Sequence, residues 1–396
     1  MSNIKPLKYF PAFDGVRGLF CILIISHHWV MPYLQGPFTF MWWLLQVFFM
    51  LSAYLITRIL LFDKTRMDSK ALFKRFYTRR ILRIFPLYFF YVILIGGLLL
   101  LAGTTEQGAL NPDVIYFKQN WGYLFTYTYN FAEIGNYFRD INYIPAPLFS
   151  HLWSLSLEEQ FYFIFPVAIV FLPFKFLRKF VIAIIIGAPI VRLLTYYFLN
   201  EMNSDPNWLG LISVRNTFFQ LDTLAYGMAV AVFDTSKIRN SVKIFLGVFI
   251  FWIIYTFVSA HYIVEAGSAK NIHAAIKEYT FMTYHMNYVF YFTLTNFMCA
   301  LLVVTVVNNT AITRLFTNKP AIFLGRISYG IYVWHYFVML LAAGLLHPIM
   351  GSHVKYIGNF WVELGMYLFY LALLILVAHL SYKYLEVYFI KLKSKT

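Results

Sequence analysis

Residues 38–62 read FTFMWWLLQVFFMLSAYLITRILLF, an apolar run with a single charge at Arg58. About 20 residues of helix cross the hydrocarbon of a bilayer, so this run is long enough to span it. Similar runs recur along the 396 residues, of which 61% are hydrophobic and only 12% charged, about half the share typical of soluble domains. The composition excludes a soluble globular protein, a disordered chain and, with two cysteines, a disulfide scaffold. It predicts an all-α, polytopic integral membrane protein.

The apolar runs predict about ten transmembrane helices in one domain that covers residues 1–396. Each run has the length or the composition expected of a span, and the fourth is the shortest. We find no internal repeat, so we expect a single architecture and not two related halves. The expected spans are 13–30, 38–62, 85–102, 160–174, 180–199, 216–233, 244–260, 284–306, 321–345 and 358–384.

The basic residues predict how these spans are oriented. Lys and Arg number 32 against 17 Asp and Glu, a net charge of +15. In a soluble protein this excess would suggest nucleic acid, but in a membrane protein basic residues collect in cytoplasmic loops. Placing both termini in the cytoplasm puts most of them inside, including a basic loop at 63–84. The few that then face outward are Lys118, Arg139, Arg215, Lys270, Lys277 and Lys355.

A large outward loop is expected at 103–159. Within it, segment 114–131 (VIYFKQNWGYLFTYTYNF) is aromatic but also polar, so we expect it to lie along the membrane surface. Its rings fit either an interfacial aromatic belt or a stacking surface for sugar rings.

Charged residues inside the first span, FDGVRGLFCILIISHHW, predict a functional site, because charge within the hydrocarbon is costly. Arg17 and His28 differ by about 20° around a helix and by roughly 16 Å along it, so they share one face. Asp14 lies one turn from Arg17 and is expected to pair with it. His27 points about 100° away from His28, so the two histidines are assigned different roles. An interhelical salt bridge is the alternative role for Asp14 and Arg17.

Two further clusters of charge lie at the predicted span ends. Arg79, Arg80 and Arg83 lead into the third span and suit either a polyphosphate ligand, which guanidinium binds bidentately, or a topology signal that contacts anionic lipid. The segment HLWSLSLEEQFY, residues 151–162, opens the fourth span. Glu158 and Glu159 face different directions there, so we expect one of them to enter the interior; helix capping is the alternative. Among the other polar residues within spans, Ser52, Asp222 and His335, the last two are expected to be ordinary buried, hydrogen-bonded groups.

Several of these segments together resemble the membrane-bound acyltransferase-3 family. The first span is similar to the family's opening motif, in which an Arg, ten further residues and a His share the span. FFMLSAYLIT resembles its second-span motif, with Ala53 in place of a common Gly. RRILRIFPLY is similar to its inward Arg-Arg-x-x-Arg motif. HLWSLSLEEQFYFIFP is similar to its fourth-span entry, and FLGRISYGIYVWH to its late segment. Gln220 departs from the Arg that many members carry. The motifs run in order from residue 10 to about 335.

The resemblance implies an acyl-CoA-dependent O-acyltransferase of the cytoplasmic (inner) membrane. Such an enzyme moves an acyl group, usually acetyl from acetyl-CoA, to a hydroxyl of an extracytoplasmic or lipid-linked carbohydrate, and needs no metal. Candidate acceptors include lipopolysaccharide O-antigen, capsule, other polysaccharides and peptidoglycan. The sequence shows no resemblance to an SGNH esterase domain, so we expect a stand-alone member, with any periplasmic acyl relay on a separate protein.

The residues then take the following roles. His28 is the general base or acyl carrier, with Glu158, Asp14 and Arg17 as the other catalytic residues. Acetyl-CoA is bound by Arg79, Arg80, Arg83, Arg17 and Ser52. The acceptor is bound by His151, Trp153, Glu159 and Tyr162. A transporter or flippase of a lipid-linked or glycan substrate is the alternative function, since it also suits buried charges, but paired broken helices are absent from the sequence pattern.

Overall fold

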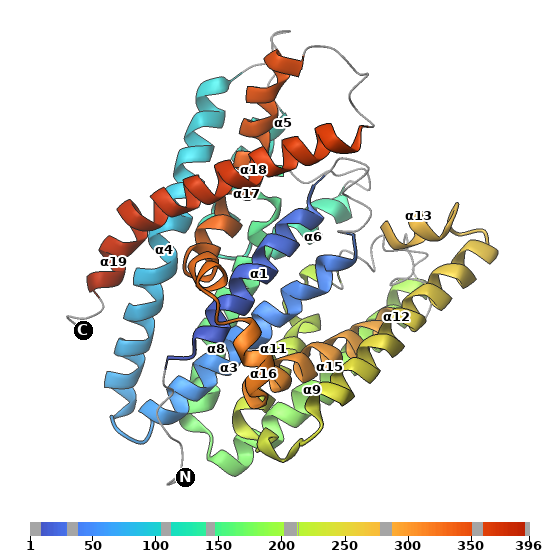
Figure 1. Cartoon of the computed structure of the whole chain (residues 1–396). Coiled ribbons are helices and arrows are strands. Elements are labelled where there is room, and N and C mark those ends of the chain that lie inside the picture. Colours follow the sequence, from blue (N-terminus) through green and yellow to red (C-terminus); the bar gives the residue numbers. More distant parts are fainter. Residues whose placement is uncertain are drawn as a thin grey trace.

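The computed structural model describes residues 9–29, 39–103, 112–139, 147–201, 212, 214–277, 287–350 and 359–392. These residues form helices joined by short turns, with no strand among them (Figure 1). The α-helices are α1 (Pro11–His27), α3 (Leu44–Asp63), α4 (Ser69–Ala102), α5 (Pro112–Phe125), α6 (Tyr129–Arg139), α7 (Pro147–Ser150), α8 (Leu152–Phe171), α9 (Phe174–Glu201), α11 (Leu221–Val232), α12 (Ser241–Glu265), α13 (Ile272–Lys277), α15 (Asn287–Asn308), α16 (Thr310–Leu315), α17 (Lys319–Met350), α18 (Phe360–Ser381) and α19 (Val387–Leu392). The 3₁₀ turns are η1 (Thr39–Trp43), η2 (Thr217–Phe219) and η3 (Thr235–Lys237), and η5 (Tyr382–Glu386) is a π-helical turn between α18 and α19.

The helices confirm an all-α, polytopic membrane protein. In the described part of the chain, 8 helical segments are long and apolar enough to cross a membrane. They correspond to α3, α4, α8, α9, α12, α15, α17 and the continuous α18–α19 segment. Two further expected spans correspond to shorter helices, α1 with 17 residues and α11 with 12.

Two predicted boundaries were wrong, because helices α4 and α8 begin well before their most apolar stretches. Residues 69–84 of the expected basic loop form the first half of α4, which starts where the Asp68 carboxylate accepts a hydrogen bond from the Ala71 amide (2.9 Å). Helix α8 begins at Leu152, so Glu158 and Glu159 lie inside it and do not cap it. For α4, the capping hydrogen bond of Asp68 starts the helix before the window that hydropathy detects.

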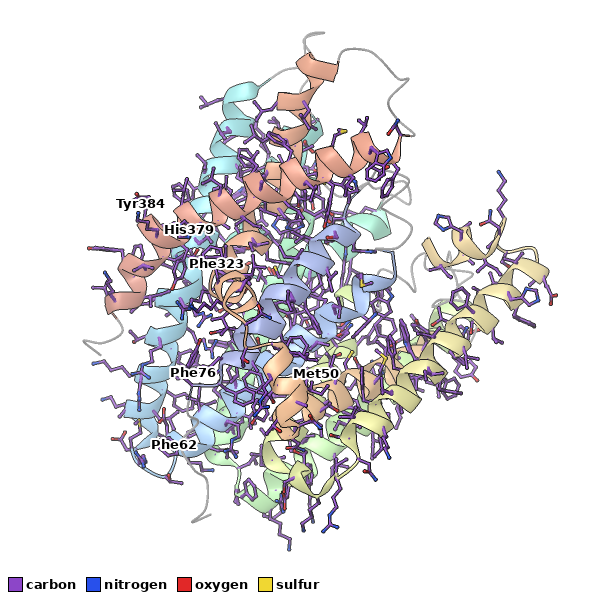
Figure 2. The ribbon with its side chains drawn as sticks, viewed as in Figure 1. Met50, Phe62, Phe76, Phe323, His379 and Tyr384 are labelled. Carbon is purple, nitrogen blue, oxygen red and sulfur yellow. The ribbon has the colours of Figure 1, made fainter. Side chains whose placement is uncertain are left out.

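Glycines bring α1 against α17 and α3 against α11 at the centre of the molecule. A Cβ on Gly18 would lie 2.4 Å from the Ala321 carbonyl oxygen, and one on Gly325 would lie 1.9 Å from that of Asp14. Met50 of α3 (Figure 2) meets Gly227 of α11, where a Cβ would lie 2.3 Å from the Met50 carbonyl oxygen. Since both sides of each contact are backbone, only glycine fits. These crossings fix α1, α3 and α17, the helices that carry much of the site described below.

Replacing Gly325 with alanine is expected to destabilise the protein by about 1–3 kcal/mol, the usual range for overpacking a tight core. The new methyl would have to displace the Asp14 backbone, which no rotamer change relieves. Thermal unfolding in detergent would measure the loss. Gly187→Ala in α9 is the matched control, because a Cβ there meets no atom within 4 Å; equal stability of the two variants would contradict this account of the crossing.

The aromatic segment 114–131 packs against α4. It forms α5 and the start of α6, and α5 runs antiparallel along the second half of α4. A Cβ on Gly96 would lie 2.2 Å from the Phe117 ring, Phe125 stacks on Phe89 at 5.5 Å, and the Tyr127 ring lies 5.3 Å from Phe85. The tip of this hairpin therefore reaches the middle of α4. Gly96 leaves room for the Phe117 ring. Tyr127 and Tyr129 are buried, whereas Trp121 and Tyr123 are exposed.

Candidate active site

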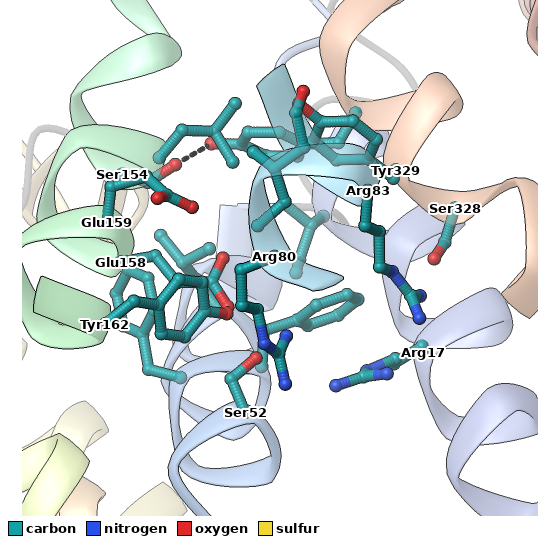
Figure 3. Close-up of a pocket in the computed structure, with 17 residues that line it drawn as sticks. Arg17, Ser52, Arg80, Arg83, Ser154, Glu158, Glu159, Tyr162, Ser328 and Tyr329 are labelled. Carbon is teal, nitrogen blue, oxygen red and sulfur yellow. Dashed lines mark hydrogen bonds between the residues drawn. The ribbon is translucent and has the colours of Figure 1, made fainter. Parts of the chain in front are cut away.

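Helices α1, α3, α4, α8 and α17 converge on a cavity with about 830 Å³ of empty space, its opening included (Figure 3). Its apolar wall comes mainly from α1, α3 and α4. Its polar lining residues are Arg17, Ser52, Arg80, Arg83, Ser154, Glu158, Glu159, Tyr162, Ser328, Tyr329 and Tyr332. Seven of the residues predicted for the site, from three separate motifs and the first span, thus meet at one cavity.

One end of the cavity carries three guanidinium groups. Figure 3 shows Arg17, Arg80 and Arg83 directed into a common space. Within the described residues, none of the three has an ion-pair partner within 4.0 Å. The guanidinium of Arg80 lies over the Tyr162 ring at 4.9 Å, which holds it in place. Arginines gathered without carboxylate partners suit an anionic ligand with several charges.

The middle of the cavity carries the two carboxylates. The Tyr162 hydroxyl donates a hydrogen bond to Glu158 Oε1, and Ser52 lines the same cavity. Both Glu158 and Glu159 line the cavity, which corrects our prediction that only one enters the interior. The cavity wall extends far enough around α8 to include two positions that differ by about 100°. Glu159 Oε1 is buried without a hydrogen-bond partner.

The other end of the cavity leads to a cluster of three histidines. The Tyr332 hydroxyl, on the cavity wall, bonds the Ser154 hydroxyl at 2.5 Å and the His151 carbonyl oxygen at 3.0 Å. Behind it, the His335 ring stacks on His28 with 5.0 Å between centroids and lies 4.7 Å from the His151 ring. His28 Nδ1, His151 Nδ1 and His335 Nε2 are each buried without a hydrogen-bond partner. Each therefore has a ring nitrogen available to a ligand or a proton.

Comparison with known proteins identifies the family of this chain. The family model for an acyltransferase domain, the acyltransferase-3 family, matches residues 10–383. The chain belongs to this acyltransferase family. The five segments that carried the resemblance in the sequence lie on α1, α3, α4, α8 and α17, the helices that meet at the cavity.

Several O-acetyltransferases are similar to this acyltransferase-family chain. It is 26% identical over 400 residues to a protein of Staphylococcus aureus (strain COL) that is named an O-acetyltransferase by inference, an alignment that covers 98% of this chain and 59% of the relative. It is 26% identical over 399 residues to the peptidoglycan O-acetyltransferase OatA of Listeria monocytogenes serovar 1/2a, covering 96% and 55%. Its identity to the O-acetyltransferase OatA of Staphylococcus aureus (strain NCTC 8325) is 24% over 385 residues, covering 96% and 57%.

The chain therefore spans less than two thirds of the length of these curated acyltransferase relatives. No solved structure gives a significant match.

The remaining predicted site residues of the acyltransferase domain lie outside the cavity lining. Asp14 accepts a hydrogen bond from the Tyr9 hydroxyl (2.6 Å) and makes no ion pair with Arg17 within 4.0 Å. Arg79 is turned about 100° from Arg80 and does not line the cavity. Trp153 is buried, edge-on to Phe49 at 6.5 Å. His28 and His151 belong to the histidine cluster at the end of the cavity.

The sequence analysis did not assign any residue of α17 to the candidate site. His335, expected to be an ordinary buried group, lies between His28 and His151. Ser328 and Tyr332, which line the cavity, precede it by seven and three residues. Since residues spaced by three, four and seven share one helix face, the periodicity of SYGIYVWH carried a signal for this surface.

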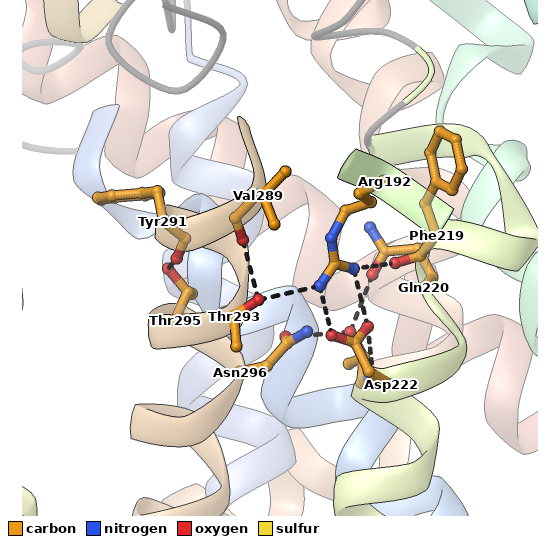
Figure 4. A network of polar contacts seen from close by, with 10 residues as sticks. Arg192, Phe219, Gln220, Asp222, Val289, Tyr291, Thr293, Thr295 and Asn296 are labelled. Carbon is orange, nitrogen blue, oxygen red and sulfur yellow. Dashed lines mark hydrogen bonds and ion pairs between the residues drawn. The ribbon is translucent and has the colours of Figure 1, made fainter. Parts of the chain in front are cut away.

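Asp222 has a structural role, as we expected, and lies in a network apart from the cavity (Figure 4). Its carboxylate receives two hydrogen bonds from Arg192, at 2.6 and 3.0 Å, and both side chains are fully buried. Arg192 also donates to the Phe219 carbonyl oxygen and the Thr293 hydroxyl. The pair joins α9, α11 and α15, which support the site from one side.

Proposed function

We propose that this protein is an O-acyltransferase that transfers an acetyl group from acetyl-CoA to a hydroxyl of a carbohydrate acceptor. The observation that carries this function is a cavity lined by three arginines without carboxylate partners. Tyr332 on its wall hydrogen-bonds the His151 carbonyl oxygen, beside a cluster of histidines with unbonded ring nitrogens. The named activities of the relatives also support O-acetylation.

The donor is proposed to bind at the arginine end. Arg80, Arg83 and Arg17 would hold the CoA phosphates, since guanidinium and phosphate pair bidentately. Ser52 and Arg79 would support this end from α3 and α4. The pantetheine arm would then extend along the cavity toward Tyr332, so that the thioester lies near His28. With both termini in the cytoplasm, this route leads from a cytoplasmic donor to an outward acceptor.

The histidine end is proposed to carry out the chemistry. Nδ1 of a neutral His28 would take the proton of the acceptor hydroxyl as its oxygen attacks the thioester carbonyl. A new C–O bond forms, the C–S bond breaks, and the CoA thiolate takes up the proton. In the variant mechanism His28 itself is acetylated first and the acceptor then attacks the acyl-imidazole. Glu158 would position the acceptor or the imidazole, and Asp14 with Arg17 would shape the local electrostatic field.

The acceptor is proposed to approach from the outer side of the cytoplasmic (inner) membrane. His151, Glu159 and Tyr162 would position its hydroxyl, and Trp153 would support His151 from behind. Peptidoglycan, lipopolysaccharide and other surface polysaccharides are the candidate acceptors, reached directly or through a separate periplasmic relay protein.

Release of CoA thiol by the purified protein in nanodiscs tests the proposed function. Acetyl-CoA would be supplied with crude surface glycan, and mass spectrometry would detect acetyl groups on the glycan. We expect thiol release that depends on the glycan, together with acetylation of its hydroxyls. Failure to bind acetyl-CoA would overturn the function, and movement of glycan across the membrane without thiol release would indicate a flippase.

Removing two donor-site arginines is expected to weaken donor binding. The double variant R80A/R83A should raise the apparent KM for acetyl-CoA by about 10–100-fold, which corresponds to the loss of one or two charge-assisted hydrogen bonds. The kcat at saturating donor should change much less. Lys74→Ala, which removes an exposed cation from the same helix, is the control; an equal change in both variants would show general electrostatics and not a phosphate site.

A further inference from the structure

A second cavity adjoins the first, between α4, α8 and the tip of the α5–α6 hairpin. It has about 1110 Å³ of empty space, its opening included. Its wall is mainly apolar, with Ile81 and Phe85 from α4 and Phe163 and Ile164 from α8. Three residues, Arg80, Glu159 and Tyr162, line both cavities. The second cavity therefore ends at one carboxylate, Glu159, and at Arg80 of the candidate active site.

We expect the mouth of the second cavity to face the hydrocarbon of the bilayer. Phe163 is 73% exposed and Ile164 58%, although both belong to a helix apolar enough to cross a membrane. Ile81 on α4 is 44% exposed. Large apolar side chains exposed on two neighbouring spans are expected to contact lipid. On this ground we infer that the gap between them opens laterally toward the bilayer.

The inner end of this cavity carries polar atoms that lack partners. Both the Tyr127 hydroxyl and Glu159 Oε1 are buried without a hydrogen bond. Tyr127 is held firmly, since its ring stacks on Tyr88 at 4.4 Å and its carbonyl oxygen accepts a bond from the Gln160 amide at 2.7 Å. Buried polar groups are usually hydrogen-bonded, and these two atoms, on residues that line the same cavity, could both bond a polar group bound there.

We propose that this cavity binds the hydrocarbon chain of a lipid-anchored acceptor and that the acceptor's sugar hydroxyls meet Tyr127 and Glu159. This proposal rests on the proposed function and narrows its acceptor to the lipid-linked class. The tail of such a lipid stays in the bilayer at every stage, so its head group requires a lateral entrance, whereas a water-soluble acceptor requires none. A mainly apolar cavity with two unbonded polar atoms at its inner end matches an amphiphile of this kind.

Photolabelling tests the cavity without relying on activity. The probe is dodecyl maltoside with a diazirine on its alkyl chain, added to the full-length protein in vesicles of phosphatidylethanolamine and phosphatidylglycerol. We expect labelled peptides from the cavity segments of α4 and α8. The variant Ile81→Trp, which fills the mouth, should lower the labelling at least about tenfold, the loss expected when about two methylene groups no longer fit.

The control is Ile93→Trp, on the same helix and 61% exposed but outside the cavity, which should label like the wild type. Equal labelling of Ile81→Trp and Ile93→Trp would overturn the proposal. Competition by palmitoyl-CoA but not by acetyl-CoA would also overturn it, because the cavity would then hold the chain of a long acyl donor.

An activity measurement separates this proposal from the proposed function. Acetyl transfer would be measured to a glycolipid and to the same saccharide without its lipid. Ile81→Trp should raise the KM for the glycolipid at least about tenfold and leave acetyl-CoA binding unchanged. No transfer by the wild type, with labelling of the cavity intact, would count against the acyltransferase function alone. Wild-type transfer that Ile81→Trp leaves unchanged would count against the cavity alone.

Discussion

The His28→Ala variant is expected to bind acetyl-CoA normally but to lose about 10²–10⁴-fold in the rate of acetyl transfer, the contribution of a positioned acid–base group. The physical reason is the environment of the ring. His28 Nδ1 is buried and has no hydrogen-bond partner, so it can accept a proton from a ligand. The arginines that would bind the donor lie at the far end of the cavity, since Arg17 is roughly 16 Å away along α1.

The matched control for this variant is His27→Ala. The two histidines are neighbours at the end of α1, with ring centroids 5.4 Å apart, but only His28 stacks on His335 in the cluster that adjoins the cavity. We expect His27→Ala to keep most of its activity. Thiol release with the preferred glycan, measured beside acetyl-CoA binding, checks both variants. Full transfer by His28→Ala would contradict the general-base mechanism and the acyl-histidine mechanism alike.

A measurement on the wild-type protein without acceptor distinguishes the two proposed roles of His28. An acyl-histidine intermediate predicts that the wild-type protein, mixed with acetyl-CoA without acceptor, releases one equivalent of thiol and gains an acetyl group on the peptide that contains His28. General-base catalysis predicts neither result without acceptor. Rapid acid quenching and mass spectrometry of the peptides give the answer directly.

The features that the sequence predicted correctly depend on single helices or on composition. The positions of Arg17 and His28 on one face followed from the helical repeat, and the all-α membrane fold followed from hydrophobicity alone. The order of the motifs indicated the family that the comparison confirmed. Each of these inferences depends on local spacing or composition, which the chain carries before it folds.

Contacts between helices were harder to predict from the sequence. The stacking of His335 on His28 depends on α1 and α17 lying side by side, which backbone contacts at Gly18 and Gly325 allow. The sequence around each glycine does not indicate which helix packs against it. The packing of α5 on α4 was missed for a similar reason, because the sequence does not show that the space beside Gly96 accepts the Phe117 ring.

We expect a large effect on stability from breaking the buried ion pair of Arg192 and Asp222. Asp222→Asn should lower the free energy of unfolding by about 3–5 kcal/mol, the typical cost of removing one partner from a buried ion pair. The lost charge leaves the Arg192 guanidinium uncompensated at a point where three helices meet and water does not reach. Unfolding in detergent with a chemical denaturant, followed by tryptophan fluorescence, would measure this change.

Replacing both partners tests whether the cost arises from the unpaired charge. The double variant Arg192→Met with Asp222→Leu should recover most of the stability, because apolar residues of similar volume often substitute for a buried ion pair without penalty.

The exposed pair of Lys237 and Asp234, whose side chains are 83% and 57% accessible, provides a control in which Asp234→Asn should cause no measurable change. If the double variant were less stable than Asp222→Asn, the hydrogen bonds of Arg192 to Phe219 and Thr293, and not its charge balance, would hold α9, α11 and α15 together. The pair lies apart from the cavity, so these variants should alter the amount of folded protein and leave the KM for acetyl-CoA unchanged in the fraction that remains folded.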